Sequence, residues 1–183
     1  RANAIYPHYA TPLVWLARSH ILCVGQGWST DLAHDSGEAR RHADAAVACD
    51  PNDAYALAVW GFAQAYLHRD FDVAIATFNR AVTINPSAVW PWAWSASAHA
   101  WRGEGDKAIP LVTRAIELSP FDPHMYNFAA IACGAYAVAG DYPTAVEWGR
   151  RSVRDNRQFS AAHKLLTIAL ALAGHEGEAR AAA

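Results

Sequence analysis

The chain has 183 residues, of which 53% are hydrophobic and 17% are charged. This composition argues against intrinsic disorder, and the length suffices for a packed core. A net charge of −2 argues against nucleic acid as a partner, because a nucleic-acid-binding surface needs clustered Lys and Arg. No uninterrupted apolar run reaches the ~18–20 residues of a membrane span, so we expect no membrane partner either.

Five alanines recur along the chain at nearly equal intervals, each after a short turn-forming stretch. They are 35, 34, 37 and 34 residues apart, and each is predicted to open an amphipathic helix: Ala39, Ala74, Ala108, Ala145 and Ala179. An internal period near 34 residues is typical of arrays of helix–turn–helix repeats. Apolar residues follow at i+4 and i+7, as Phe78 and Ala81 do after Ala74, which indicates one buried face per helix.

Prolines mark the ends of the helices that these alanines open. Pro51, Pro86 and Pro120 each fall 12 residues after an alanine of the series, and the residue before a proline is disfavoured in a helix. The first repeat differs from the others, because residues 24–29 are predicted to form a longer link between its two helices.

The most complete repeat pattern lies in residues 55–86. It has Trp60-Gly61 in a first helix, Asp70-Phe71 in the turn, and Ala74, Phe78, Ala81 and Pro86 in a second helix. At these residues the chain resembles the tetratricopeptide repeat (TPR) family, and the resemblance covers nearly the whole chain. It implies an all-α fold, a right-handed superhelix of antiparallel helix pairs. We expect a single TPR array, a segment of a larger protein, with about five units of which the last is incomplete: 3–51, 52–86, 87–120, 121–157 and 158–183.

No pattern in the sequence predicts catalysis, a cofactor or a metal ion. The three cysteines, Cys23, Cys49 and Cys133, are far apart and form no CxxC pair, so we expect reduced thiols in a cytoplasmic protein. His34 and His42 are eight residues apart, too far for one metal ion without a third ligand between them. Glycine-rich phosphate loops and nucleophile motifs are absent. We therefore expect no catalysis by this segment, and any catalytic activity would lie in a domain outside it.

Aromatic side chains are the most informative residues of the chain. Trp90, Trp94 and Trp101 follow i, i+4 and i+11 spacing, so they share one helix face. They are either core residues or a recognition surface, because Trp and Tyr are frequent in both. The resemblance implies that the first helix of each unit lines a concave, almost uncharged groove for an apolar or amphipathic protein segment. The candidate groove residues are Tyr55, Phe62, Tyr66, Trp90, Trp94, Trp101, Asn127 and Lys164.

The sequences of three segments resemble one particular group of TPR proteins. Ala93-Trp94-Ser95 and residues 118–123 and 145–154 are similar to the C-terminal TPR arrays of bacterial class III adenylyl cyclases and winged-helix transcriptional regulators. This similarity implies a protein–protein interaction scaffold, the regulatory or partner-binding part of a bacterial multidomain signalling protein. Two alternatives remain open, a self-association module that forms a homodimer and a groove for a small ligand.

Overall fold

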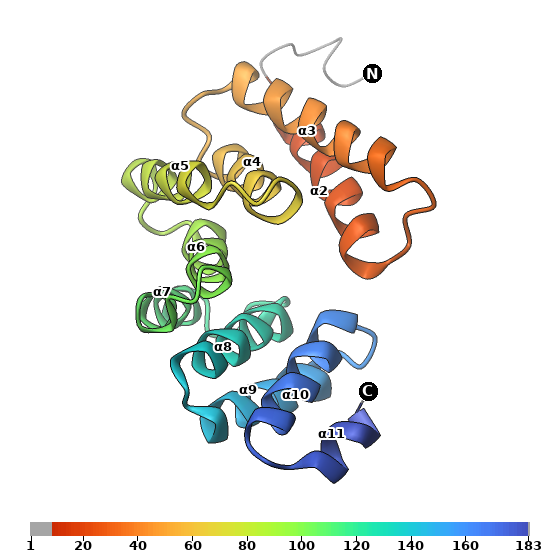
Figure 1. The fold of residues 1–183 in the computed structure, drawn as a ribbon. Coiled ribbons are helices and arrows are strands. Elements are labelled where there is room, and N and C mark those ends of the chain that lie inside the picture. The colour runs from red at the N-terminus through yellow and green to blue at the C-terminus, as the bar shows by residue number, and fades with distance from the viewer. Residues whose placement is uncertain (1–8, 183) are drawn as a thin grey trace. The chain divides into compact units, whose positions relative to one another are not determined.

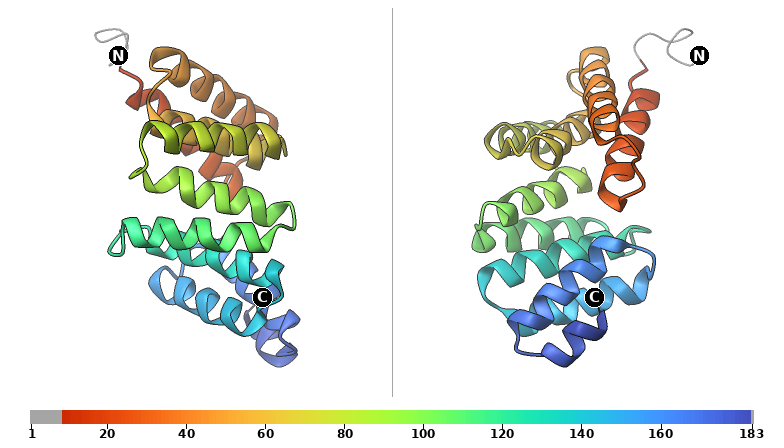
Figure 2. Two further views of the ribbon diagram at one scale, coloured as in Figure 1. Left: turned by 90° about the vertical axis from the view of Figure 1, so that its left-hand side faces the viewer. Right: turned by 45° about the vertical axis from the view of Figure 1, so that its right-hand side comes forward.

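The computed structural model describes residues 9–182, which form ten α-helices and contain no β-strand (Figures 1 and 2). The predicted all-α class is therefore confirmed. Short turns join the helices. No helix in the described part of the chain is long and apolar enough to cross a membrane. The helices are α2 (Thr11–Gln26), α3 (Leu32–Cys49), α4 (Ala54–Leu67), α5 (Phe71–Ile84), α6 (Val89–Trp101), α7 (Gly105–Leu118), α8 (Met125–Ala139), α9 (Tyr142–Asp155), α10 (Ser160–Leu172) and α11 (Glu176–Ala182).

The chain divides into two compact units, residues 1–94 (unit 1) and 95–183 (unit 2). The boundary falls inside α6, so that the first half of this helix belongs to unit 1 and the second half to unit 2. In unit 1, α2 packs against α3 and α4 packs against α5. In unit 2, α8 packs against α7, α9 and α10, and α10 also packs against α9 and α11.

Aspartates cap the N-termini of several of these helices, and prolines follow the C-terminal ends of three. The side chains of Asp31, Asp70 and Asp141 each accept a hydrogen bond from a backbone N–H of the first turn, which satisfies a donor that the helix leaves free. As predicted, α3, α5 and α7 each end two residues before Pro51, Pro86 and Pro120.

All five alanines of the series are buried, with at most 7% of their surface exposed. The four later ones are the fourth residue of their helix, which confirms the predicted pattern. For Ala39 the prediction is wrong, because α3 begins at Leu32 and Ala39 is its eighth residue. The helix therefore has one additional N-terminal turn, which Asp31 caps.

The link between the first two helices is longer than the two- or three-residue links of the later helix pairs, as predicted, but its predicted position at residues 24–29 is wrong. Helix α2 continues to Gln26, and Gly27 follows it with a φ of 74°. In this left-handed conformation the Gly27 N–H bonds the Val24 carbonyl, and the Trp28 N–H bonds the Cys23 carbonyl, so the last turn is closed. The connection between α2 and α3 is thus residues 27–31.

Small residues allow the helices of each unit to approach closely. A Cβ atom on Gly61 would lie 2.8 Å from the ring of the fully buried Phe78, which explains the pairing of these two residues in unit 1. In unit 2, a Cβ atom on Gly149 would lie 3.0 Å from Leu166 and 3.1 Å from the sulfur of Cys133. Burial raises the pKa of the Cys133 thiol to about 12, so this cysteine serves packing and is a poor nucleophile.

Candidate functional site

Five of the eight predicted groove residues meet in unit 1. Tyr55, Phe62 and Tyr66 come from α4, and Trp90 and Trp94 come from α6. The ring centroids of Phe62 and Trp94 are 4.7 Å apart, those of Trp90 and Trp94 are 4.8 Å apart, and those of Phe62 and Tyr66 are 5.5 Å apart. We call this cluster, together with Trp15 and Arg18 of α2, the aromatic surface.

The members of the aromatic surface differ in exposure, which separates packing from recognition. Trp94 is only 4% exposed and contacts Tyr55, Phe62 and Trp90, so it is a core residue on which the other rings rest. Those three rings are half-buried. Half-buried rings on a rigid base can contribute surface to a partner at little cost in conformational entropy.

Helix α2 contributes two residues that the sequence analysis did not predict. The guanidinium of Arg18 lies 4.6 Å from the ring centroid of Trp90 and 5.3 Å from that of Trp15, and it also donates a hydrogen bond to the hydroxyl of Tyr55. The prediction of an almost uncharged groove is therefore wrong at Arg18. The i, i+3 spacing of Trp15 and Arg18 on one helix was the available signal.

The electrostatics of the aromatic surface depend on Arg18 and Tyr55. Burial raises the pKa of the Tyr55 hydroxyl, and the charge and hydrogen bond of Arg18 oppose that effect without cancelling it. Tyr55 is therefore a neutral phenol at physiological pH, and the Arg18 charge has no internal counter-charge from this contact. Trp15 is 53% exposed and leaves an apolar face open beside that charge.

The other three predicted groove residues lie in unit 2. Trp101 is near the end of α6 and is 39% exposed, Asn127 is half-buried on α8, and Lys164 is exposed on α10. That they share one groove with the aromatic surface stays a prediction.

A second cluster of side chains joins α2 to α3. His20 comes from α2, Glu38 and His42 come from α3, and one ligand atom of each lies within 4.8 Å of the others. Hydrogen bonding to Arg41 lowers the pKa of the Glu38 carboxyl to about 2, so the group is ionised. Burial is the main cause that lowers the pKa of His42, which favours a neutral imidazole.

The spacing of residues along one helix does not reveal this cluster. Glu38 lies four residues before His42 and therefore on the same face of α3, whereas His34 is not one of the three residues of the cluster. His20, by contrast, becomes a neighbour of these residues only when α2 folds against α3. The i, i+4 pair was visible in the sequence, whereas the partner from α2 was not.

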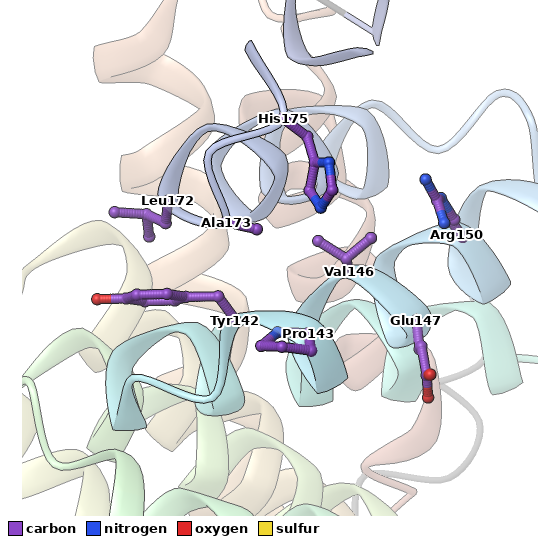
Figure 3. A pocket seen from close by; sticks show the side chains of 8 residues that line it. All are labelled: Tyr142, Pro143, Val146, Glu147, Arg150, Leu172, Ala173 and His175. Carbon is purple, nitrogen blue, oxygen red and sulfur yellow. The ribbon is translucent and has the colours of Figure 1, made fainter. Parts of the chain in front are cut away.

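A surface pocket of about 410 Å³ lies in unit 2 between α9 and the end of α10 (Figure 3). None of the eight predicted groove residues lines it, so it is separate from the groove in which a small ligand was predicted. Arg150 at its rim pairs with Glu178 of α11. The lining residues are Tyr142, Pro143, Val146, Glu147, Arg150, Leu172, Ala173 and His175.

Comparison with known structures identifies the fold. PilW, a type IV pilus biogenesis factor, aligns with a TM-score of 0.74 and 21% identity, over 94% of this chain and 74% of that one. TTC0263, a TPR protein of Thermus thermophilus, aligns with a TM-score of 0.68 and 19% identity, over 93% of this chain and 86% of that one. MamA from Desulfovibrio magneticus RS-1 aligns with a TM-score of 0.61 and 17% identity, over 93% of this chain and 90% of that one.

These alignments confirm the predicted TPR fold. Neither the family models nor the curated proteins include a match to the sequence.

Proposed function

We propose that the chain is a protein–protein interaction scaffold, and that the aromatic surface of unit 1 binds a segment of its partner. The TPR fold supports the general role, because such arrays offer extended surfaces built from stacked helices. The observation that supports the location is the position of Arg18, whose guanidinium lies over both Trp15 and Trp90.

Core packing alone accounts poorly for this arrangement. A tryptophan in the core is buried, yet Trp15 is 53% exposed beside Arg18. Trp, Tyr and Arg are also the residue types most enriched in binding hot spots. The stacked rings of Phe62 and Trp94 hold the surface rigid, which reduces the entropy that a partner must lose on binding.

The chemistry of the surface specifies its occupant. Apolar rings favour aliphatic or aromatic side chains, and the positive charge of Arg18 favours one carboxylate placed among them. We therefore propose an amphipathic protein segment that combines large apolar residues with an Asp or Glu. The Arg18 guanidinium lies over the Trp90 ring and donates one hydrogen bond to Tyr55, and it has further N–H groups that can donate to a carboxylate.

Selection from a library of random 12-residue peptides tests this proposal. We expect the full chain to enrich peptides that contain large apolar residues and an acidic residue. In calorimetry, Arg18→Ala and Trp90→Ala should each weaken a selected peptide about tenfold or more, as expected for hot-spot residues. Phe121→Ala is the matched control, because Phe121 is 95% exposed and lies in unit 2. Peptides that bind both unit 1 variants as tightly as the unaltered chain would refute the proposed surface.

We infer the cellular context from the similarity of residues 118–123 and 145–154 to bacterial regulatory TPR arrays. On that basis we propose a cytoplasmic, non-catalytic regulatory module of a bacterial signalling protein, made of one array with unit boundaries near residues 51, 86, 120 and 157. The genomic sequence that encodes the surrounding protein tests this context. An adjoining cyclase or winged-helix domain is the expected result, and a protein without any signalling domain would contradict it.

Self-association is the second candidate, and exposed apolar residues of α10 favour it. Ile168 is 51% exposed and Leu172 is 48% exposed, and a four-residue spacing places them on one side of the helix. Light scattering at several concentrations separates the two functions. A strict monomer at all concentrations would exclude the homodimer and leave partner binding as the function.

A further inference from the structure

The histidine cluster between α2 and α3 has the donors of a metal site. His20, Glu38 and His42 each place one ligand atom within 4.8 Å of the others, which is close enough for a single ion to bind all three after small side-chain rotations. We propose that these three residues bind a divalent transition-metal ion, and that the preferred ion is Zn²⁺.

The donor set selects the class of metal. Two imidazole nitrogens and one carboxylate oxygen suit zinc, whereas magnesium and calcium prefer oxygen ligands throughout. Three protein ligands leave the fourth tetrahedral position to water. All three side chains come from packed helices, so their positions are defined before an ion arrives.

Asp35 supports the site from outside. The Nδ1 of His20 lies 2.7 Å from a carboxylate oxygen of Asp35, which accepts its proton and leaves Nε2 as the free ligand atom. A carboxylate behind a metal-binding histidine fixes the tautomer and the ring orientation. Asp35 belongs to the additional first turn of α3, which is the turn that distinguishes this helix from its counterparts in the later repeats.

A cation already bridges two of the ligands. One guanidinium nitrogen of Arg41 lies 2.6 Å from Oε2 of Glu38 and 3.0 Å from Nε2 of His42. These two lone pairs therefore converge on a common point. The Arg41 side chain is 61% exposed, so an incoming ion can displace it into solvent at little cost.

His42 is the ligand whose environment most needs an explanation. It is only 8% exposed, and its Nδ1 has no hydrogen-bond partner. A buried polar atom without a partner is uncommon in folded proteins and is destabilising. The ion would bind at Nε2, which lies 3.5 Å from Oε2 of Glu38, and Nδ1 would keep the proton.

The site is specific to the first helix pair. The equivalents of Glu38 in the later repeats are Val73, Lys107, Thr144 and Glu178, and those of His42 are Thr77, Leu111, Trp148 and Ala182. No later repeat has both ligands, so the cluster does not follow from the repeat pattern. A bound ion would join α3 to α2, the helix that also carries Trp15 and Arg18.

Zinc titration of the full chain without a polyhistidine tag tests the proposal. Calorimetry with Zn²⁺ should give one site per chain, and Co²⁺ should produce the visible absorption of tetrahedral coordination. We expect His20→Ala and His42→Ala to abolish the site and Asp35→Asn to weaken it by about 10- to 100-fold. His68→Ala is the control, because His68 is exposed in the turn after α4.

Arg41→Ala gives the sharpest result, because scattered surface histidines would not respond to it. Removal of the competing guanidinium should tighten zinc binding, whereas Arg151→Ala, which removes a comparable exposed ion pair with Asp155, should not. Circular dichroism establishes that each variant is folded. If His42→Ala unfolds, Glu38→Gln and Arg41→Ala decide, since both side chains are on the surface of α3. Failure of the unaltered chain to bind one equivalent, or equal affinity in all variants, would overturn the proposal.

Discussion

Gly105 is the glycine of unit 2 at which an added Cβ atom would meet the closest contact. A Cβ atom there would lie 2.5 Å from the backbone nitrogen of Ala139 and 2.8 Å from its Cα, and a backbone cannot move aside as a flexible side chain can. We expect Gly105→Ala to lower the free energy of unfolding by about 1–3 kcal/mol or more, as overpacked cores do. Urea denaturation followed by circular dichroism measures the change.

Gly37 provides the matched control within a helix. It lies in α3, and a Cβ atom there would have no heavy atom within 4 Å other than those of its chain neighbours and its own helix backbone. Gly37→Ala should therefore raise the free energy of unfolding by about 0.5–1 kcal/mol, through helix propensity alone. If the two substitutions change stability in the same direction, the close approach of α7 to α8 is not what restricts Gly105.

At the scale of the element, Glu38 ties the stability of α3 to pH. Hydrogen bonds from Arg41 lower its pKa from 4.5 to about 2 in the folded state. A depressed carboxyl pKa contributes stability that is complete above the unfolded pKa and is lost as the pH falls toward the folded one. We expect Glu38→Gln to lower the urea midpoint at pH 7 and this difference to shrink between pH 4.5 and pH 2. A difference that does not change with pH would contradict the ion pair.

Some helix ends could be predicted from the sequence, whereas the start of α3 and the contact of Arg18 could not. The alanine series and the prolines predicted the ends of α5 and α7, because turn residues and helix stops act locally. They misplaced the start of α3, because the series marks where a helix is buried rather than where Asp31 caps it. Arg18 was missed for a different reason. Its contact with Tyr55 joins residues 37 positions apart, and only the packing of α2 against α4 brings them together.

At the scale of the whole molecule, the two compact units have different surface chemistry. Unit 1 contains the aromatic surface and the histidine cluster, which share α2 as a common element. Unit 2 contains close helix contacts at Gly105 and Gly149, and a pocket with mixed polar and apolar lining. We therefore expect recognition of the partner to depend on unit 1, and substitutions in unit 2 to change stability more than affinity.

The eight tryptophans allow one measurement to locate the partner directly. Each indole N–H gives its own signal in a nitrogen-15 NMR spectrum, and single Trp→Phe variants assign the signals. On titration with a selected peptide, we expect the signals of Trp15 and Trp90 to shift. The signal of Trp60, whose indole donates to Asp44, should stay in place, as should that of Trp148 in unit 2. Shifts at Trp148 with Trp15 and Trp90 unchanged would contradict the aromatic surface as the binding site.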